Sequence, residues 1–239
     1  MKPGTLTRDS PRIWIYGGVH HDPGTRQKFL GELAKQTEAP RFVAVEWEKS
    51  VFERFISWRS WIKERVQCWD FLTSEDCDEL SRAFAWEGDA YAEIFPTSCV
   101  VWLETGFQEE NFRARYGAKA CEAPESFARS LVARVCNPCQ PTMKEMIDNV
   151  EPPSKPTTKK ELLDRVWSNA WSDAWEETGG LDRDARWAST ISKRGSSLRN
   201  GWIAVVVGWQ HADLAGNDQR LQGLLSSKGF RVKSVRLGP

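Results

Sequence analysis

Two of the three histidines in this chain lie in matching short motifs, one near each end of the sequence. The motifs are Gly17-x-x-His20-x-Asp22 and Gly208-x-x-His211-x-Asp213, and each follows an apolar run. An imidazole can ligate a divalent metal ion or act as a general acid or base at neutral pH. The repeated frame therefore indicates one site that is built by both ends of the chain.

A glutamate is the third candidate, because Glu46 ends the apolar run "RFVAVEW" (41–47). A carboxylate at the end of a buried strand costs several kcal/mol unless it is paired or coordinated. Ligands of parallel α/β proteins bind beyond the carboxyl ends of the strands, where Glu46, His20 and His211 would meet. Together they could hold a divalent metal ion, or provide the base and orienting groups that activate water.

The residues around each histidine predict the turn that carries it and the charge of its imidazole. A glycine three residues earlier lets the turn pass close to bound groups. Each histidine also precedes a predicted helix N-terminus, whose positive partial charge disfavours the imidazolium, so we expect neutral imidazoles. Asp22 and Asp213 are expected mainly as helix N-caps. His21 has no counterpart in the second motif and is expected to be a wall residue.

The elements that must position these groups are short apolar runs typical of strands. We expect strands at residues 12–17, 41–47, 98–104, 202–208 and 230–237. The second and fourth runs are nearly continuous in apolar residues, which indicates burial on both faces and hence a parallel sheet. A helix starting at Pro23 would join the first two strands, and the last forty or so residues repeat the plan. We therefore predict an α/β fold with a mostly parallel central sheet formed by N- and C-terminal βα units.

The middle of the chain, about residues 50–195, is predicted to be a mostly helical insertion within a single domain spanning 1–239. Trp167, Trp171 and Trp175 recur at helical spacing and share a face, which favours a packed core or a helix–helix contact. The cysteines of "CNPC" (136–139) lack the second pair that zinc would need, so we interpret them as free thiols.

Composition argues against two classes of partner. Lys and Arg total 33, as do Asp and Glu, and no basic cluster marks a nucleic-acid site. No apolar run is long enough to span a bilayer, and the first residues lack the apolar segment of a secretory signal. We expect a cytoplasmic protein that acts on a small molecule or peptide and binds neither nucleic acid nor membrane; its oligomeric state is left open.

The motifs resemble those of the TraB/PrgY/GumN–Tiki family, within the wider erythromycin esterase-like and ChaN-like superfamily. The resemblance rests on the two G-x-x-H motifs, on the strand-end glutamate and on "LDRDARWASTI" (181–191), which is similar to that family's helical Arg-Asp/Asn-x-x-Met/Trp-Ala segment. It implies an α/β fold with a helical middle. It also implies metal-dependent hydrolysis centred on His20, Glu46 and His211, with Arg183 and Asp184 nearby.

The leading hypothesis from the sequence is a hydrolase of an amide or ester bond. His20 and His211 would ligate Mn²⁺, Co²⁺ or Zn²⁺ or position water, and Glu46 would be a third ligand or the general base. Arg183 would bind a carboxylate or stabilise an oxyanion. Three alternatives stay open: a metal-independent His/Glu esterase-like enzyme, a non-catalytic protein that binds a ligand or haem in the same cleft, and a partner-binding regulator.

Overall fold

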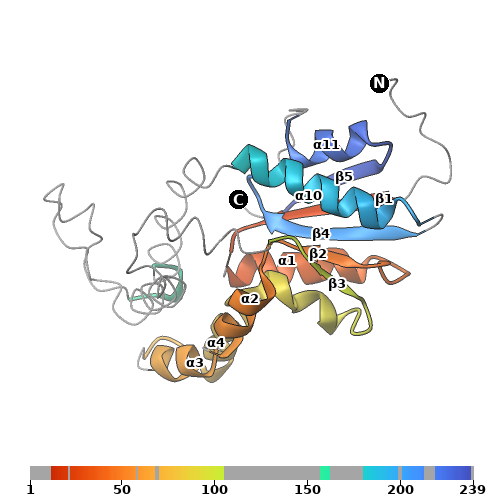
Figure 1. Ribbon diagram of the computed structural model, residues 1–239. Helices are drawn as coiled ribbons and strands as arrows, with labels where there is room; N and C mark the ends of the chain where they lie inside the picture. Colours follow the sequence, from red (N-terminus) through yellow and green to blue (C-terminus); the bar gives the residue numbers. More distant parts are fainter. Residues whose placement is uncertain are drawn as a thin grey trace, which may run out of the picture.

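The computed structural model describes residues 12–20, 22–57, 59–67, 70–104, 157–161, 180–198, 201–212 and 219–237. Its centre is a five-stranded sheet in the order β3-β2-β4-β1-β5, in which every neighbouring pair is parallel (Figure 1). The strands are β1 (Arg12–Gly18), β2 (Val43–Val45), β3 (Val100–Trp102), β4 (Trp202–Gly208) and β5 (Arg231–Arg236). The predicted α/β fold with a parallel sheet is confirmed.

The two longest strands, β1 and β4, form the middle of the sheet. All seven residues of β4 are buried, as its continuous apolar run predicts for a strand covered on both faces. β2 is shorter than the predicted 41–47, because the chain bends at Glu46 and Trp47. The backbone N–H of Glu46 still donates to the carbonyl oxygen of Val206 in β4 at 3.1 Å, and the Glu46 side chain lies in the polar cluster described below.

Helix α1 (Pro23–Ala34) follows β1 and begins as predicted. The Asp22 side chain accepts hydrogen bonds from Thr25 N at 2.7 Å and Thr25 Oγ1 at 2.6 Å, and Pro23 is the first helical residue. Phe29 and Leu33 are fully buried against the sheet. The chain then returns to β2, which does not pair with β1, because β4 lies between the two strands.

Helices cover both faces of the sheet. Phe29 and Leu33 of α1 belong to one core cluster, together with Tyr16 and Trp86. The opposite face packs against α10 (Gly180–Gly195) and α11 (Leu221–Ser227), which lie on the other side of the sheet in Figure 1. Gly229 ends the α11 turn with a φ of +87°, a conformation that glycine adopts without a steric penalty.

The first part of the predicted insertion is helical. It contains α2 (Lys49–Ser57), α3 (Arg59–Val66), α4 (Ser74–Ala83) and the 3₁₀ turns η1 (Trp86–Gly88) and η2 (Ala90–Glu93). None of the helices among the described residues is long and apolar enough to cross a membrane. Several predictions fall outside the described residues, namely those for His21, Asp213, the cysteines at 136 and 139 and the tryptophans at 167, 171 and 175.

Candidate active site

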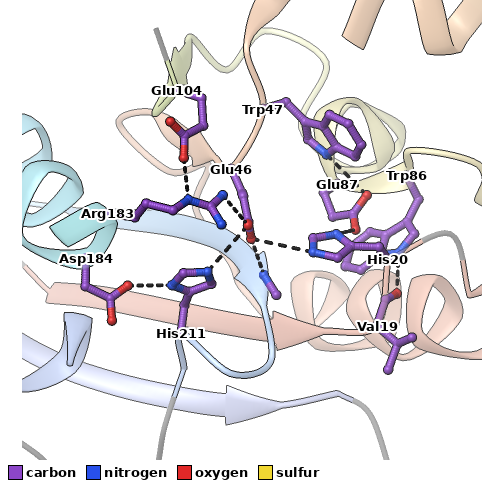
Figure 2. Close-up of polar contacts among 11 residues, drawn as sticks. Val19, His20, Glu46, Trp47, Trp86, Glu87, Glu104, Arg183, Asp184 and His211 are labelled. Carbon is purple, nitrogen blue, oxygen red and sulfur yellow. Dashed lines mark hydrogen bonds and ion pairs between the residues drawn. The ribbon is translucent and has the colours of Figure 1, made fainter. Parts of the chain in front are cut away.

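The structure brings His20, Glu46 and His211 together at the carboxyl ends of three neighbouring strands (Figure 2). Glu46 directly follows β2, His20 follows β1, and His211 follows β4. Nε2 of His20 lies 3.7 Å from Oε2 of Glu46, and Nε2 of His211 lies 3.5 Å from Oε1 of the same carboxylate. The two imidazoles therefore point at Glu46 from opposite sides.

The two glycines of the repeated motif have different surroundings. The two G-x-x-H motifs align Gly208 with Gly17. In the β1–β4 ladder, however, Gly208 pairs with Gly18, so the motif alignment and the strand register differ by one residue. A Cβ on Gly208 would lie 3.0 Å from Nε2 of His20 and 3.3 Å from Oε2 of Glu46. A Cβ on Gly17 would instead lie 2.3 Å from Cβ of Ala212. Of these two glycines, Gly208 is the one at which a Cβ would contact the side chains of the site, His20 and Glu46.

Glu46 is held as a charged group. Its Oε2 accepts the Gly208 backbone N–H at 2.5 Å, and its Oε1 accepts Nη2 of Arg183 at 2.7 Å. Burial favours the protonated acid, but interactions with His211, Arg183 and His20 outweigh burial and hold the pKa of Glu46 well below its usual value. Glu46 is therefore ionised in the folded protein.

His20 is backed by a second carboxylate, that of Glu87 in η1. Nδ1 of His20 contacts Oε1 of Glu87, and Oε2 of Glu87 accepts Nε1–H of Trp47 at 3.4 Å. Burial opposes protonation, but Glu87 and Glu46 outweigh burial and raise the pKa of His20 to about 9. The expected neutral imidazole is therefore wrong for His20, because two nearby carboxylates outweigh the partial charge of a helix terminus.

His211 is backed in the same way by Asp184 of α10. Its Nδ1 lies 2.5 Å from Oδ1 of the fully buried Asp184, whose other oxygen lies 3.5 Å from Nη1 of Arg220. The imidazole ring packs on Trp187, with ring centroids 4.4 Å apart. A carboxylate on Nδ1 fixes the orientation of the ring.

The site thus contains two imidazoles that are each bonded to a buried carboxylate at Nδ1 and face Glu46 with Nε2. They differ in exposure, since the His20 side chain is 16% exposed and that of His211 only 3%. Among the described residues, His20 is therefore the more accessible of the two histidines.

Arg183 links this cluster to a further carboxylate. Its Nε donates to Oε1 of Glu104 at 2.7 Å while its Nη2 donates to Glu46, and its Cζ lies 4.7 Å from the centroid of the Trp187 ring. Burial opposes the charge of Arg183, but Glu46 and Glu104 outweigh burial and raise its pKa. Burial raises the pKa of Glu104, and the Arg183 guanidinium offsets only part of that effect.

Reasoning from the sequence missed Glu87 and Glu104. Glu104 directly follows the apolar run 98–103, and this is the same signal, a carboxylate at the end of a buried strand, that identified Glu46. Glu87 carries no such signal, because it lies in a short 3₁₀ turn between helices and reaches His20 only through the tertiary fold.

The family resemblance implies a divalent metal ion bound by these residues. In the part of the chain that the structure describes, no group of three or more His, Cys, Asp or Glu side chains is arranged to hold a metal ion. Both oxygens of Glu46 already accept hydrogen bonds, one from the Gly208 N–H and one from Arg183. The residues in this arrangement do not fit a metal ion, and metal ligation by His20, Glu46 and His211 stays a prediction.

Comparison with known proteins assigns no family. No model of a known protein family matches the chain, and neither the curated proteins nor the solved structures include a match. The resemblance to the TraB/PrgY/GumN–Tiki family accordingly stays a prediction that rests on the sequence motifs and on the residues they bring into the site.

Proposed function

We propose that this protein is a hydrolase of an ester or amide bond that uses its two histidines for proton transfer. The observation that carries the proposal is the pair of imidazoles, each bonded to a buried carboxylate and each facing Glu46. Perturbed titratable groups that converge at the carboxyl ends of parallel strands are typical of catalytic sites.

Hydrolysis needs a base that takes a proton from water and an acid that gives one to the leaving group. His211 suits the role of base, because Asp184 on Nδ1 leaves Nε2 as the atom that accepts a proton and stabilises the imidazolium that forms. His20 suits the role of acid, because Glu87 and Glu46 keep it protonated at neutral pH. Its greater exposure suits contact with the leaving group.

Glu46 and Arg183 take supporting roles in this proposal. Glu46 stays ionised and stabilises positive charge on the two imidazoles that face it. Arg183 holds Glu46 in place through Nη2. Because Nε and Nη2 of Arg183 are committed to carboxylates, we assign it to positioning Glu46, in place of the contact with a substrate carboxylate or oxyanion that the sequence suggested.

The test is hydrolysis of p-nitrophenyl acetate and alanine p-nitroanilide by the wild-type protein and by His20→Gln and His211→Gln. Each substitution should lower kcat/KM by at least the ~10²-fold of a lost general acid or base. The exposed α1 change Lys35→Gln serves as control and should leave kcat/KM unaltered. Turnover that survives in both histidine variants contradicts the proposal. Failure to hydrolyse either compound, together with a Soret band on adding haem, would favour the ligand-binding alternative.

A further inference from the structure

Two buried carboxylates lie on the same edge of one guanidinium. Glu46 follows β2 and Glu104 follows its neighbour β3, and their side chains are 7% and 1% exposed. Arg183 reaches them from α10 with the fork formed by Nε and Nη2, one nitrogen to each Oε1 at 2.7 Å (Figure 2). The guanidinium is the cation that pairs with both carboxylates in this buried environment.

The groups around Arg183 are those that a divalent cation would use. Carboxylate oxygens and imidazole nitrogens are the usual ligands of Mn²⁺ and Zn²⁺, and Nε2 of both histidines faces Glu46. The Trp187 ring lies against the guanidinium on one face. A metal ion could reach the two carboxylates only by displacing a cation that two hydrogen bonds and a stacked ring hold in place.

We propose that Arg183 is the built-in cation of this site, occupying the position between Glu46 and Glu104 that a divalent metal ion would need. The wild-type protein then takes up no metal ion there. Removing the guanidinium leaves two buried carboxylates without their cation, and we expect these side chains and the adjacent histidines to shift so that a divalent cation replaces it. The inference goes beyond the hydrolase proposal, because it concerns which cation the carboxylates bind and holds whether or not the protein hydrolyses a substrate.

The experiment compares wild type with Arg183→Ala, Arg183→Lys and the matched control Arg186→Ala. Arg186 lies on the same helix, and its Nη2 is 3.9 Å from the other oxygen of Glu104, but its side chain is 45% exposed. For each protein, metal content is measured by mass spectrometry, and the melting temperature is measured with EDTA, with MnCl₂ and with ZnCl₂. None of these readouts requires a substrate.

Wild type and Arg186→Ala should carry far less than one metal ion per chain, and their melting temperatures should not respond to EDTA. Arg183→Ala should melt several degrees lower than wild type, and Mn²⁺ or Zn²⁺ should restore most of that loss while binding at about one ion per chain. Arg183→Lys keeps a positive charge but loses the fork, so it should be destabilised without gaining the response to metal.

Stoichiometric metal in the wild-type protein, with a melting temperature that EDTA lowers, would overturn the inference. So would an Arg183→Ala protein that no divalent cation stabilises. If Arg183→Ala is insoluble, expression with added Mn²⁺ or Zn²⁺ should recover soluble protein, and failure to recover it counts against the inference. A metal-free wild type that hydrolyses nothing would refute the proposed function and leave this inference standing.

Discussion

Arg183 donates a hydrogen bond from Nη2 to Oε1 of Glu46 at 2.7 Å, although 137 positions separate the two residues in the sequence. This contact joins α10 to the end of β2. It also makes Glu46 part of an ion-paired cluster in the folded protein. A substitution at Glu46 should therefore alter stability as well as activity.

Glu46→Gln should lower the free energy of unfolding by about 3–5 kcal/mol. The new amide NH₂ would face either the Gly208 N–H or Arg183, both of which are donors, and a buried charge would lose part of its pairing. Urea denaturation measures the loss. Glu53→Gln makes the same chemical change at a 62% exposed site on α2 and should alter stability by less than about 0.5 kcal/mol.

The activity of Glu46→Gln decides whether Glu46 has a role beyond this ion pair. Activity must be measured well below the new melting temperature, so that unfolding does not contribute. A loss of about 10²-fold fits a group that stabilises the charged imidazoles. A destabilised protein that keeps full activity would show that Glu46 is only a structural counter-charge.

The stability of the protein should fall as the pH rises through about 9. The pKa of His20 is raised in the folded protein, so its contribution is fully present below pH 6.5 and is lost above about pH 9. The size of the effect is roughly 3 kcal/mol. Urea denaturation of wild type and His20→Gln across this range measures it as the difference between the two proteins, and parallel pH profiles would contradict the assignment.

Glu87→Gln should lower the pKa of His20 toward its ordinary value of 6.5. The substitution removes the buried carboxylate on Nδ1, which is the strongest influence that favours the imidazolium, while burial continues to oppose it. With only three histidines, ¹³C-labelled imidazole signals can be titrated by NMR and assigned with single His→Gln variants.

The matched control for Glu87 is Glu93→Gln, which alters a neighbouring 3₁₀ turn at a carboxylate that pairs with Arg26. It should leave the His20 titration unchanged. If Glu87→Gln also leaves the titration unchanged, Glu87 does not set the proton state of His20, and the assignment of His20 as the acid loses its support.

Gly208→Ala should impair activity more than it impairs folding. The added Cβ would lie 3.0 Å from His20 Nε2 and 3.3 Å from Glu46 Oε2, so both side chains must move by a few tenths of an ångström. Displacements of this kind can cost catalysis substantially, up to about 10²-fold for a 1 Å misplacement. Gly31→Ala on α1 is the control, because nothing lies within 4 Å of its Cβ; it should stabilise the protein by about 0.5–1 kcal/mol.

The sequence by itself determined the features that depend on neighbouring residues. The continuous apolar run 202–208 predicts a strand buried on both faces, and β4 has those bounds. Asp22 and Pro23 predict the start of α1, because a side-chain acceptor and a fixed φ act within one turn. That His20, Glu46 and His211 meet could also be anticipated, since parallel strands bring their carboxyl ends to one edge of the sheet.

The tertiary structure decided what depends on contacts between distant segments. The order β2-β4-β1 makes the strands that end in Glu46, His211 and His20 neighbours in the sheet, and no local pattern specifies that order. The proton state of His20 depends on Glu87, which lies 67 positions away in a turn without a motif. Charge interactions in a buried site depend on distance through space, and only the folded chain sets that distance.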